Sequence, residues 1–113
     1  MTEKSGVSKD IQAFVQQHMD GWNHDEWMGF IHHLGEAGHD VSDLDGIGLA
    51  LEQERLRCTL KTWGIKGLGP KRIEAITHSY ASLENMRGTD GPGIADRTGL
   101  PKQIANEVAA RLF

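Results

Sequence analysis

The chain has few of the residues that build covalent cross-links and thiolate metal sites. Its 113 residues include one cysteine, Cys58. A single cysteine excludes an internal disulfide and is too few for a thiolate zinc site. Cys58 lies close to the apolar Leu60, so we expect a buried or half-buried thiol rather than a nucleophile. No cofactor is predicted.

Long apolar stretches are absent as well. The longest uncharged apolar stretch runs from Ile47 to Leu51, which is far too short to cross a bilayer. The first ten residues are polar and lack the apolar segment of a secretory signal. We therefore expect a cytoplasmic protein without a membrane partner.

The chain has no net basic charge, but its two halves differ in the sign of their net charge. The formal net charge is −4 at pH 7. Residues 1–58 hold four bases and eleven acids, a net charge of −7, whereas residues 59–113 hold eight bases and five acids, a net charge of +3. Because local clustering decides whether a surface attracts phosphate, we divide the chain into an acidic region, 1–58, and a basic region, 59–113. Four bases of the second region lie within twelve positions: Lys61, Lys66, Lys71 and Arg72.

The spacing of apolar residues is helical nearly throughout. No segment alternates apolar and polar residues long enough to predict a strand, so the expected fold class is all-α, a small helical bundle. Ser8 is expected to cap a first helix that ends at Gly21. Asn23, with Glu26 three residues later, predicts a capping box at the start of a second helix.

A third helix is expected to join the acidic and basic regions. Ser42 or Asp43 is a suitable cap, and the apolar positions predict a helix from residue 44 to about residue 63. Gly48 lies inside this helix and leaves room for a break or kink.

The basic region is rich in glycine and predicts shorter elements. Pro70 suits the first turn of a helix. Residues 82–86 predict a short helical turn, residues 88–93 a linker, and residues 101–112 a final helix. The buried face of the helix that Pro70 opens is expected to comprise Ile73, Ile76 and Tyr80.

The basic region also repeats itself with a shift of 32 residues. Gly67 aligns with Gly99, and Leu68 aligns with Leu100. The apolar positions that follow also coincide: Ile73, Ile76 and Tyr80 align with Ala105, Val108 and Leu112. Each copy predicts a short helix, a tight hairpin with a glycine, and a second helix.

Such a hairpin is suited to phosphate. Glycine allows a backbone conformation that other residues avoid and permits a ligand to approach closely. The helix that follows begins with unpaired N–H groups at the positive end of its dipole, which favours an anion. Lys71 and Arg72 in one copy and Lys102 in the other add charge there. Contacts of this kind hold DNA without reading its sequence.

The first copy resembles a known family. Residues 65–72 read IKGLGPKR and residues 80–84 read YASLE. This pattern closely resembles the tandem helix-hairpin-helix domain of the bacterial excinuclease C subunit, and related modules occur in junction-binding proteins, DNA ligases and nucleases. The resemblance covers roughly the last fifty residues and implies binding to duplex or junction DNA, in repair or recombination. The implied phosphate-binding residues are Lys66, Gly67, Leu68, Gly69, Lys71 and Arg72 in the first hairpin, and Thr98, Gly99, Lys102 and Gln103 in the second.

The second hairpin departs from the family pattern. Pro101 stands where the first hairpin has its second glycine, and proline has no N–H. We therefore expect the second hairpin to offer one backbone donor fewer.

Other interpretations compete with DNA binding. Some helix-hairpin-helix pairs mediate dimerisation, and the acidic region suits a basic protein partner. A metal-dependent nuclease is a further alternative, but no zinc-protease motif appears and His32 and His33 would point about 100° apart on a helix. We predict no metal site and no catalytic activity. Arg87 and Arg97 are expected at the surface or in ion pairs, and Trp27 in the core.

Overall fold

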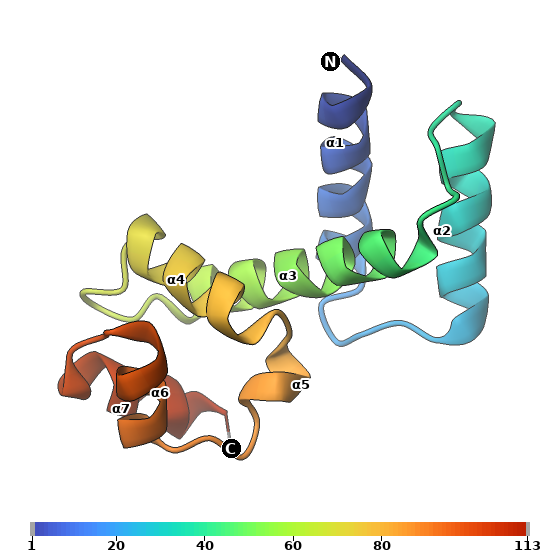
Figure 1. The fold of residues 1–113 in the computed structure, drawn as a ribbon. Coiled ribbons are helices and arrows are strands. Elements are labelled where there is room, and N and C mark those ends of the chain that lie inside the picture. The colour runs from blue at the N-terminus through green and yellow to red at the C-terminus, as the bar shows by residue number, and fades with distance from the viewer. Residues whose placement is uncertain (1, 113) are drawn as a thin grey trace.

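The protein is all-helical, as the sequence predicts. The computed structural model describes the backbone of residues 2–112 and the side chains of residues 7–112, and no strand occurs among them. Figure 1 shows the arrangement of the helices. These are α1 (Thr2–Gln17), α2 (His24–Glu36), α3 (Leu44–Trp63), α4 (Pro70–Tyr80), α5 (Leu83–Met86), α6 (Gly91–Thr98) and α7 (Lys102–Arg111).

Helix α3 connects two hydrophobic cores. Helices α1 and α2 stand at its N-terminal end, and α4 to α7 gather around its C-terminal end (Figure 1). Leu51 belongs to the first core, and Leu56 and Leu60 belong to the second. The predicted boundary between the acidic and basic regions, at residues 58 and 59, therefore falls inside one continuous helix. The first core comprises Ile11, Val15, Phe30, Leu34 and Leu51.

The helix starts in the acidic region follow the predicted caps. The side chain of Asn23 accepts a hydrogen bond from the Glu26 N–H, and the Glu26 carboxylate accepts one from the Asn23 N–H. Asp43 caps α3 by accepting from the Gly46 N–H. Helix α3 runs without a break through Gly48. These caps satisfy backbone donors that the first turn of a helix leaves unpaired.

The predicted start of the first helix is wrong. Helix α1 begins at Thr2, so Ser8 lies inside it and does not cap it. The reason is that Val7 packs against the first core together with Ile11 and Phe14, which extends the apolar face of the helix towards the N-terminus.

The predicted linker at residues 88–93 is too long. Asp90 caps α6, because its carboxylate accepts from the Gly93 N–H at 2.8 Å. Gly91 to Gly93 therefore form the first turn of α6, with Pro92 in it. Gly91 is buried against Asn106 of α7, where a side chain would collide. Close packing of α6 on α7, rather than flexibility, explains a glycine here.

The longest helix is too polar for a bilayer. Helix α3 has 20 residues, but Glu52, Glu54, Arg55 and Arg57 interrupt its apolar positions. Among the described helices, none combines the length and the apolar character that a membrane span requires.

Candidate functional site

Two pairs of helices in the basic region are each joined by a turn that contains glycine. Residues 64–69, the first hairpin, join α3 to α4. Residues 99–101, the second hairpin, join α6 to α7, and α5 lies between the two pairs. Buried residues of both hairpins and of all five helices form one core. The two hairpins are thus fixed relative to one another.

The backbone follows the predicted 32-residue register. Gly67 and Gly99 both have a positive φ, +89° and +77°. Leu68 and Leu100 are both buried. Aligned residues Gly69 and Pro101 both occupy the N-cap position of the next helix. The alignment of the two copies therefore describes a shared backbone path.

A backbone hydrogen bond and two buried apolar residues fix the conformation of the first hairpin. The Leu68 N–H donates to the Ile65 carbonyl at 3.0 Å and closes a tight turn. Gly67 is the third residue of this turn, where a positive φ favours glycine. Ile65 and Leu68 are buried, whereas Lys66 and Gly67 are exposed. The turn is thus anchored by its apolar residues and presents its glycine and lysine to solvent.

Helix α4 begins beside this turn with unpaired donors. Gly69 is its N-cap and has no side chain to accept from the first turn, and Pro70 follows. Within the described residues, the N–H groups of Gly69, Lys71 and Arg72 have no hydrogen-bond acceptor. These donors border a surface hollow lined by Gly67, Gly69, Pro70, Lys71 and Arg72. Uncapped N–H groups with a lysine beside them can bind an oxyanion.

Arg72 also has a structural contact that the sequence did not reveal. Its guanidinium donates from Nη1 to the Gly67 carbonyl at 2.6 Å. Arg72 therefore braces the first hairpin against α4, and its other N–H groups remain exposed to solvent. This bond is compatible with the predicted phosphate contact, because a guanidinium carries five donors.

The second hairpin has one unpaired backbone N–H fewer than the first, as the sequence predicts, but the difference lies at the glycines. Among the described residues the Gly67 N–H has no acceptor, whereas the Gly99 N–H donates to the Ala95 carbonyl at 2.8 Å. Each helix start has one proline without an N–H, Pro70 as the first residue of α4 and Pro101 at the N-cap of α7. Helix α7 begins with the N–H groups of Lys102, Gln103 and Ile104, and no side chain caps it. The helix start of the second hairpin therefore offers three such donors, as that of the first does. It differs in carrying fewer basic side chains.

Thr98 shapes the second hairpin. Its hydroxyl donates to the Ile94 carbonyl at 2.6 Å and accepts from the Leu100 N–H at 3.3 Å. Gly99 ends α6 in the left-handed conformation. The hydroxyl is thus already used inside the turn, which makes Thr98 a positioning residue of the hairpin.

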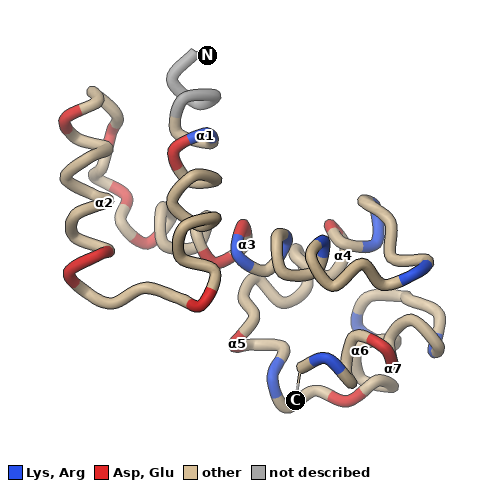
Figure 2. The backbone as a smooth tube through the Cα atoms, turned by 180° about the vertical axis from the view of Figure 1, so that it is seen from behind, with Lys and Arg blue, Asp and Glu red and all other residues tan. Residues whose placement is uncertain are grey.

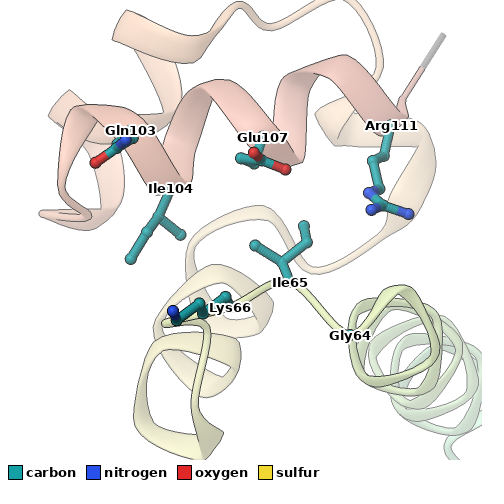
Figure 3. Close-up of a pocket in the computed structure, with 7 residues that line it drawn as sticks. All are labelled: Gly64, Ile65, Lys66, Gln103, Ile104, Glu107 and Arg111. Atoms are coloured by element: carbon teal, nitrogen blue, oxygen red, sulfur yellow. The ribbon is translucent and has the colours of Figure 1, made fainter.

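A groove separates the first hairpin from α7. Figure 3 shows Ile65 and Lys66 opposite Ile104 and Glu107. The hairpin and α7 approach closely, since a Cβ atom on Gly67 would lie 2.9 Å from Ile104 Cδ1. Arg111 lines the same groove. Sequence patterns did not identify Glu107 or Arg111 as groove residues, although Gln103, Glu107 and Arg111 recur every four residues along one helix face.

Charge is distributed unevenly along the molecule. Figure 2 shows acidic residues along α1, α2 and the start of α3, and basic residues around the hairpins. Lys66, Lys71 and Lys102 are all exposed. The two hairpins thus lie at the end of the molecule away from α1 and α2.

Arg87 and Arg97 make contacts within the chain. Arg87 pairs with Glu84 at 3.0 Å. Arg97 donates to the Ser79 carbonyl and lies 4.5 Å from the centre of the Tyr80 ring. Both arginines are exposed, and Arg87 is in an ion pair, as the sequence predicts.

Four histidines of the acidic region, His18, His32, His33 and His39, contact carboxylates. His18 pairs with Glu26 at 2.9 Å, and His39 pairs with Asp10 at 3.2 Å. Asp10 also lies 3.7 Å from His33. In the part of the chain that the structure describes, no three His, Cys, Asp or Glu side chains are grouped as a metal site would need. These pairs connect α1 to α2 and to the loop that follows it.

Cys58 is half-buried in α3. Its thiol donates to the Glu54 carboxylate, and burial, with help from Glu54, raises the pKa of Cys58 to about 11. Because the folded pKa lies above the ordinary value, the favourable contribution of the protonated thiol is lost as the pH rises from 9 through 11.

We expect iodoacetamide to alkylate Cys58 at pH 8 roughly 100-fold more slowly than a free cysteine, because the thiolate fraction is small. Mass spectrometry of timed samples measures the rate. The same protein in denaturant is the control and should react at the ordinary rate. Fast alkylation of the folded protein would contradict the raised pKa.

Comparisons with protein-family models, with curated proteins and with solved structures found no significant match to the chain. The hairpins themselves are therefore the basis for assigning a function. Their shared geometry consists of a glycine with positive φ, a buried leucine and an uncapped helix start in each.

Proposed function

We propose that α3 to α7 form a tandem helix-hairpin-helix module that binds duplex or junction DNA through its phosphate backbone. One observation carries the proposal: two hairpins of matching backbone lie next to one another, and each leads into a helix with unpaired N–H groups. Helix starts of this kind favour anions. Two anion sites held at a fixed distance suit a polymer of regularly spaced phosphates.

The first hairpin is the principal phosphate site in this proposal. Lys66 and Lys71 are exposed beside the N–H groups of Gly69, Lys71 and Arg72. The glycines allow a phosphate oxygen to approach the backbone. Arg72 keeps the turn in its conformation through the Gly67 carbonyl.

The second hairpin is the weaker site. Its N–H donors lie at Lys102, Gln103 and Ile104, and Lys102 is the one basic side chain among them. Glu107 lines the groove between this helix and the first hairpin and repels phosphate there. The first hairpin therefore contributes most of the affinity, and the second fixes the orientation of the DNA.

Binding of this type is independent of base sequence, because backbone contacts position a protein without reading bases. The resemblance to the excinuclease C subunit extends the proposal to DNA repair or recombination in the cytoplasm. We propose a binding module and assign no catalytic residue. Incubation of supercoiled plasmid with the protein and magnesium or manganese tests for nicking, which we expect to be absent.

Fluorescence anisotropy with a labelled duplex and a labelled four-way junction, at several salt concentrations, tests the proposal. Affinity should fall steeply with salt because bound phosphates release counterions. The double variant Lys66→Gln/Lys71→Gln should reduce the slope of log K against log salt by about 2, since each lost contact removes about 0.9.

The matched control is Lys9→Gln, an exposed lysine of α1 far from the hairpins. It should change the slope by less than about 0.5. The proposal fails if neither DNA binds at low salt. It also fails if Lys9→Gln weakens binding as much as either hairpin substitution does alone.

A further inference from the structure

A separate pocket lies in the acidic region, away from the hairpins. Residues of the connection between α1 and α2, the first turn of α2 and the middle of α3 line this open surface hollow. Its volume is about 390 Å³. The lining residues are Trp22, Asn23, His24, Trp27, Gly48 and Glu52.

Two tryptophans form the walls of this pocket. Trp22 packs edge-on against Phe14, with 5.3 Å between the ring centres. Trp27 reaches α3 at Gly48, where a Cβ atom would lie 3.8 Å from its Cη2. Both indoles are partly buried against the first core, and both line the pocket. Packing thus fixes the rings before any ligand arrives.

The carboxylate of Glu52 lacks a partner. Its Oε2 is shielded from solvent, and no hydrogen-bond donor reaches it within the described residues. Arg55, the basic neighbour on the same helix, donates from Nε to the Met19 carbonyl instead. Burial raises the pKa of Glu52, opposed by Arg55 and reinforced by Glu84. An isolated carboxylate of this kind is often found at a functional site.

We propose that this pocket binds the cationic side chain of an arginine or lysine from a basic segment of a partner protein. Indole faces attract cations, and tryptophan does so most strongly. The Glu52 carboxylate would accept the hydrogen bond for which the chain supplies no donor. Residues 1–58 have a net charge of −7, which attracts a basic polypeptide and repels DNA.

Arginine is the better occupant. Its planar guanidinium stacks on aromatic faces and presents several donors, whereas the lysine ammonium is a compact, strongly hydrated charge. We therefore expect an arginine peptide to bind more tightly than the matching lysine peptide. A glutamate peptide of the same length should not bind.

Tryptophan fluorescence measures this binding in the whole chain. Replacing Trp63 by phenylalanine leaves Trp22 and Trp27 as the two reporters. The probe is an acetylated octapeptide of alternating arginine and serine, with lysine and glutamate versions for comparison. Binding should change the emission of the two remaining indoles and saturate as the arginine peptide is added.

Glu52→Gln is the central variant, because it removes the charge and preserves the shape. It should weaken binding of the arginine peptide roughly tenfold. The matched control is Glu36→Gln, an exposed glutamate of α2 outside the pocket, which should change affinity less than about twofold. Gly48→Leu keeps Glu52 but fills the pocket from α3, and it should abolish binding. Circular dichroism checks that each variant is folded.

Three results would overturn the proposal. If Glu52→Gln and Glu36→Gln lost the same affinity for the arginine peptide, the binding would be a general attraction between opposite charges. Absence of binding by the arginine peptide would remove the pocket as a site. Emission that changes with protein concentration alone would identify a second copy of the chain as the occupant. DNA affinity should be unchanged in Glu52→Gln, which separates this proposal from the one made for the hairpins.

Discussion

Gly67→Ala is expected to lower the free energy of unfolding by about 1–2 kcal/mol and to weaken DNA binding more than tenfold. Gly67 has a φ of +89°, which an alanine adopts only with strain. An added Cβ would also lie 2.9 Å from Ile104 Cδ1. That methyl group can shift, so backbone strain accounts for most of the stability loss. The shift nevertheless disturbs the groove between the first hairpin and α7.

Urea unfolding followed by circular dichroism gives the stability, and anisotropy with a labelled duplex gives the affinity. The matched control is Gly29→Ala, a glycine inside α2 with no atom within 4 Å of the added Cβ. Alanine favours a helix over glycine by about 0.8–1 kcal/mol, so this control should be stabilised. Its DNA affinity should remain unchanged.

Gly69→Asp separates stability from binding at the same hairpin. Aspartate is a better N-cap residue than glycine, and the exchange stabilises a helix by roughly a few tenths of a kcal/mol. The same carboxylate would occupy the unpaired N–H groups at the start of α4 and repel phosphate. We expect higher stability together with lower DNA affinity. If Gly69→Asp bound DNA as well as the unchanged chain, the helix start would not be the phosphate site.

Local signals predicted most of the helices because each depends on residues close together in the chain. The capping box of Asn23 and Glu26 and the position of Pro70 in the first turn of α4 are of this kind. The buried face of α4 is another, since Ile73 and Ile76 recur at helical spacing. The glycines at positions 67 and 99, which are 32 residues apart, were enough to align the two hairpins.

The errors occurred where packing between distant segments overrides a local signal. Ser8 can cap a helix, but packing of Val7 on the first core extends α1 past it. Gly91 to Gly93 have the composition of a linker, but the Asp90 cap and contact with Asn106 make them a helix. In both places a tertiary contact decided the outcome.

The candidate sites were predictable to different degrees. The residues of the first hairpin follow from its motif, whereas the bond from Arg72 to the Gly67 carbonyl required the fold. The pocket between Trp22 and Trp27 unites three segments, and no spacing in the sequence indicates it. The sequence pattern was enough to predict the hairpin residues. Contacts between segments that are distant in the sequence could be identified only from the fold.

A charged cluster connects α3 to α4 and provides the second large prediction. Arg57 donates from Nε and Nη2 to the two oxygens of Glu74, and from Nη1 to Glu54. Glu54 is buried, with 8% of its surface exposed. Since α3 and α4 flank the first hairpin, this cluster helps to fix the angle between them. A planar guanidinium that binds a carboxylate through two bonds is among the stronger ion pairs.

Arg57→Met is therefore expected to lower the free energy of unfolding by about 2–3 kcal/mol at pH 7. Breaking a fully buried pair costs about 3–5 kcal/mol, and the partial exposure of Arg57 and Glu74 reduces this loss. Methionine retains the apolar stem of the side chain. The loss of stability therefore comes mainly from the buried Glu54 carboxylate, which no longer has its arginine partner. The matched control is Arg87→Met, whose pair with Glu84 is exposed and should contribute less than about 0.5 kcal/mol.

The pH dependence distinguishes loss of this ion pair from loss of packing. The hydrogen bond from Arg57 lowers the pKa of Glu74 below its ordinary value of 4.5. The stability that Glu74 contributes is therefore present above pH 4.5 and is lost as the pH falls through the lowered pKa. Arg57→Met lacks this contribution at every pH, so its deficit should shrink between pH 5 and pH 3 in urea unfolding. A deficit that stayed constant over this range would mean that Arg57 acts through its packing, and the ion pair would not be what joins α3 to α4.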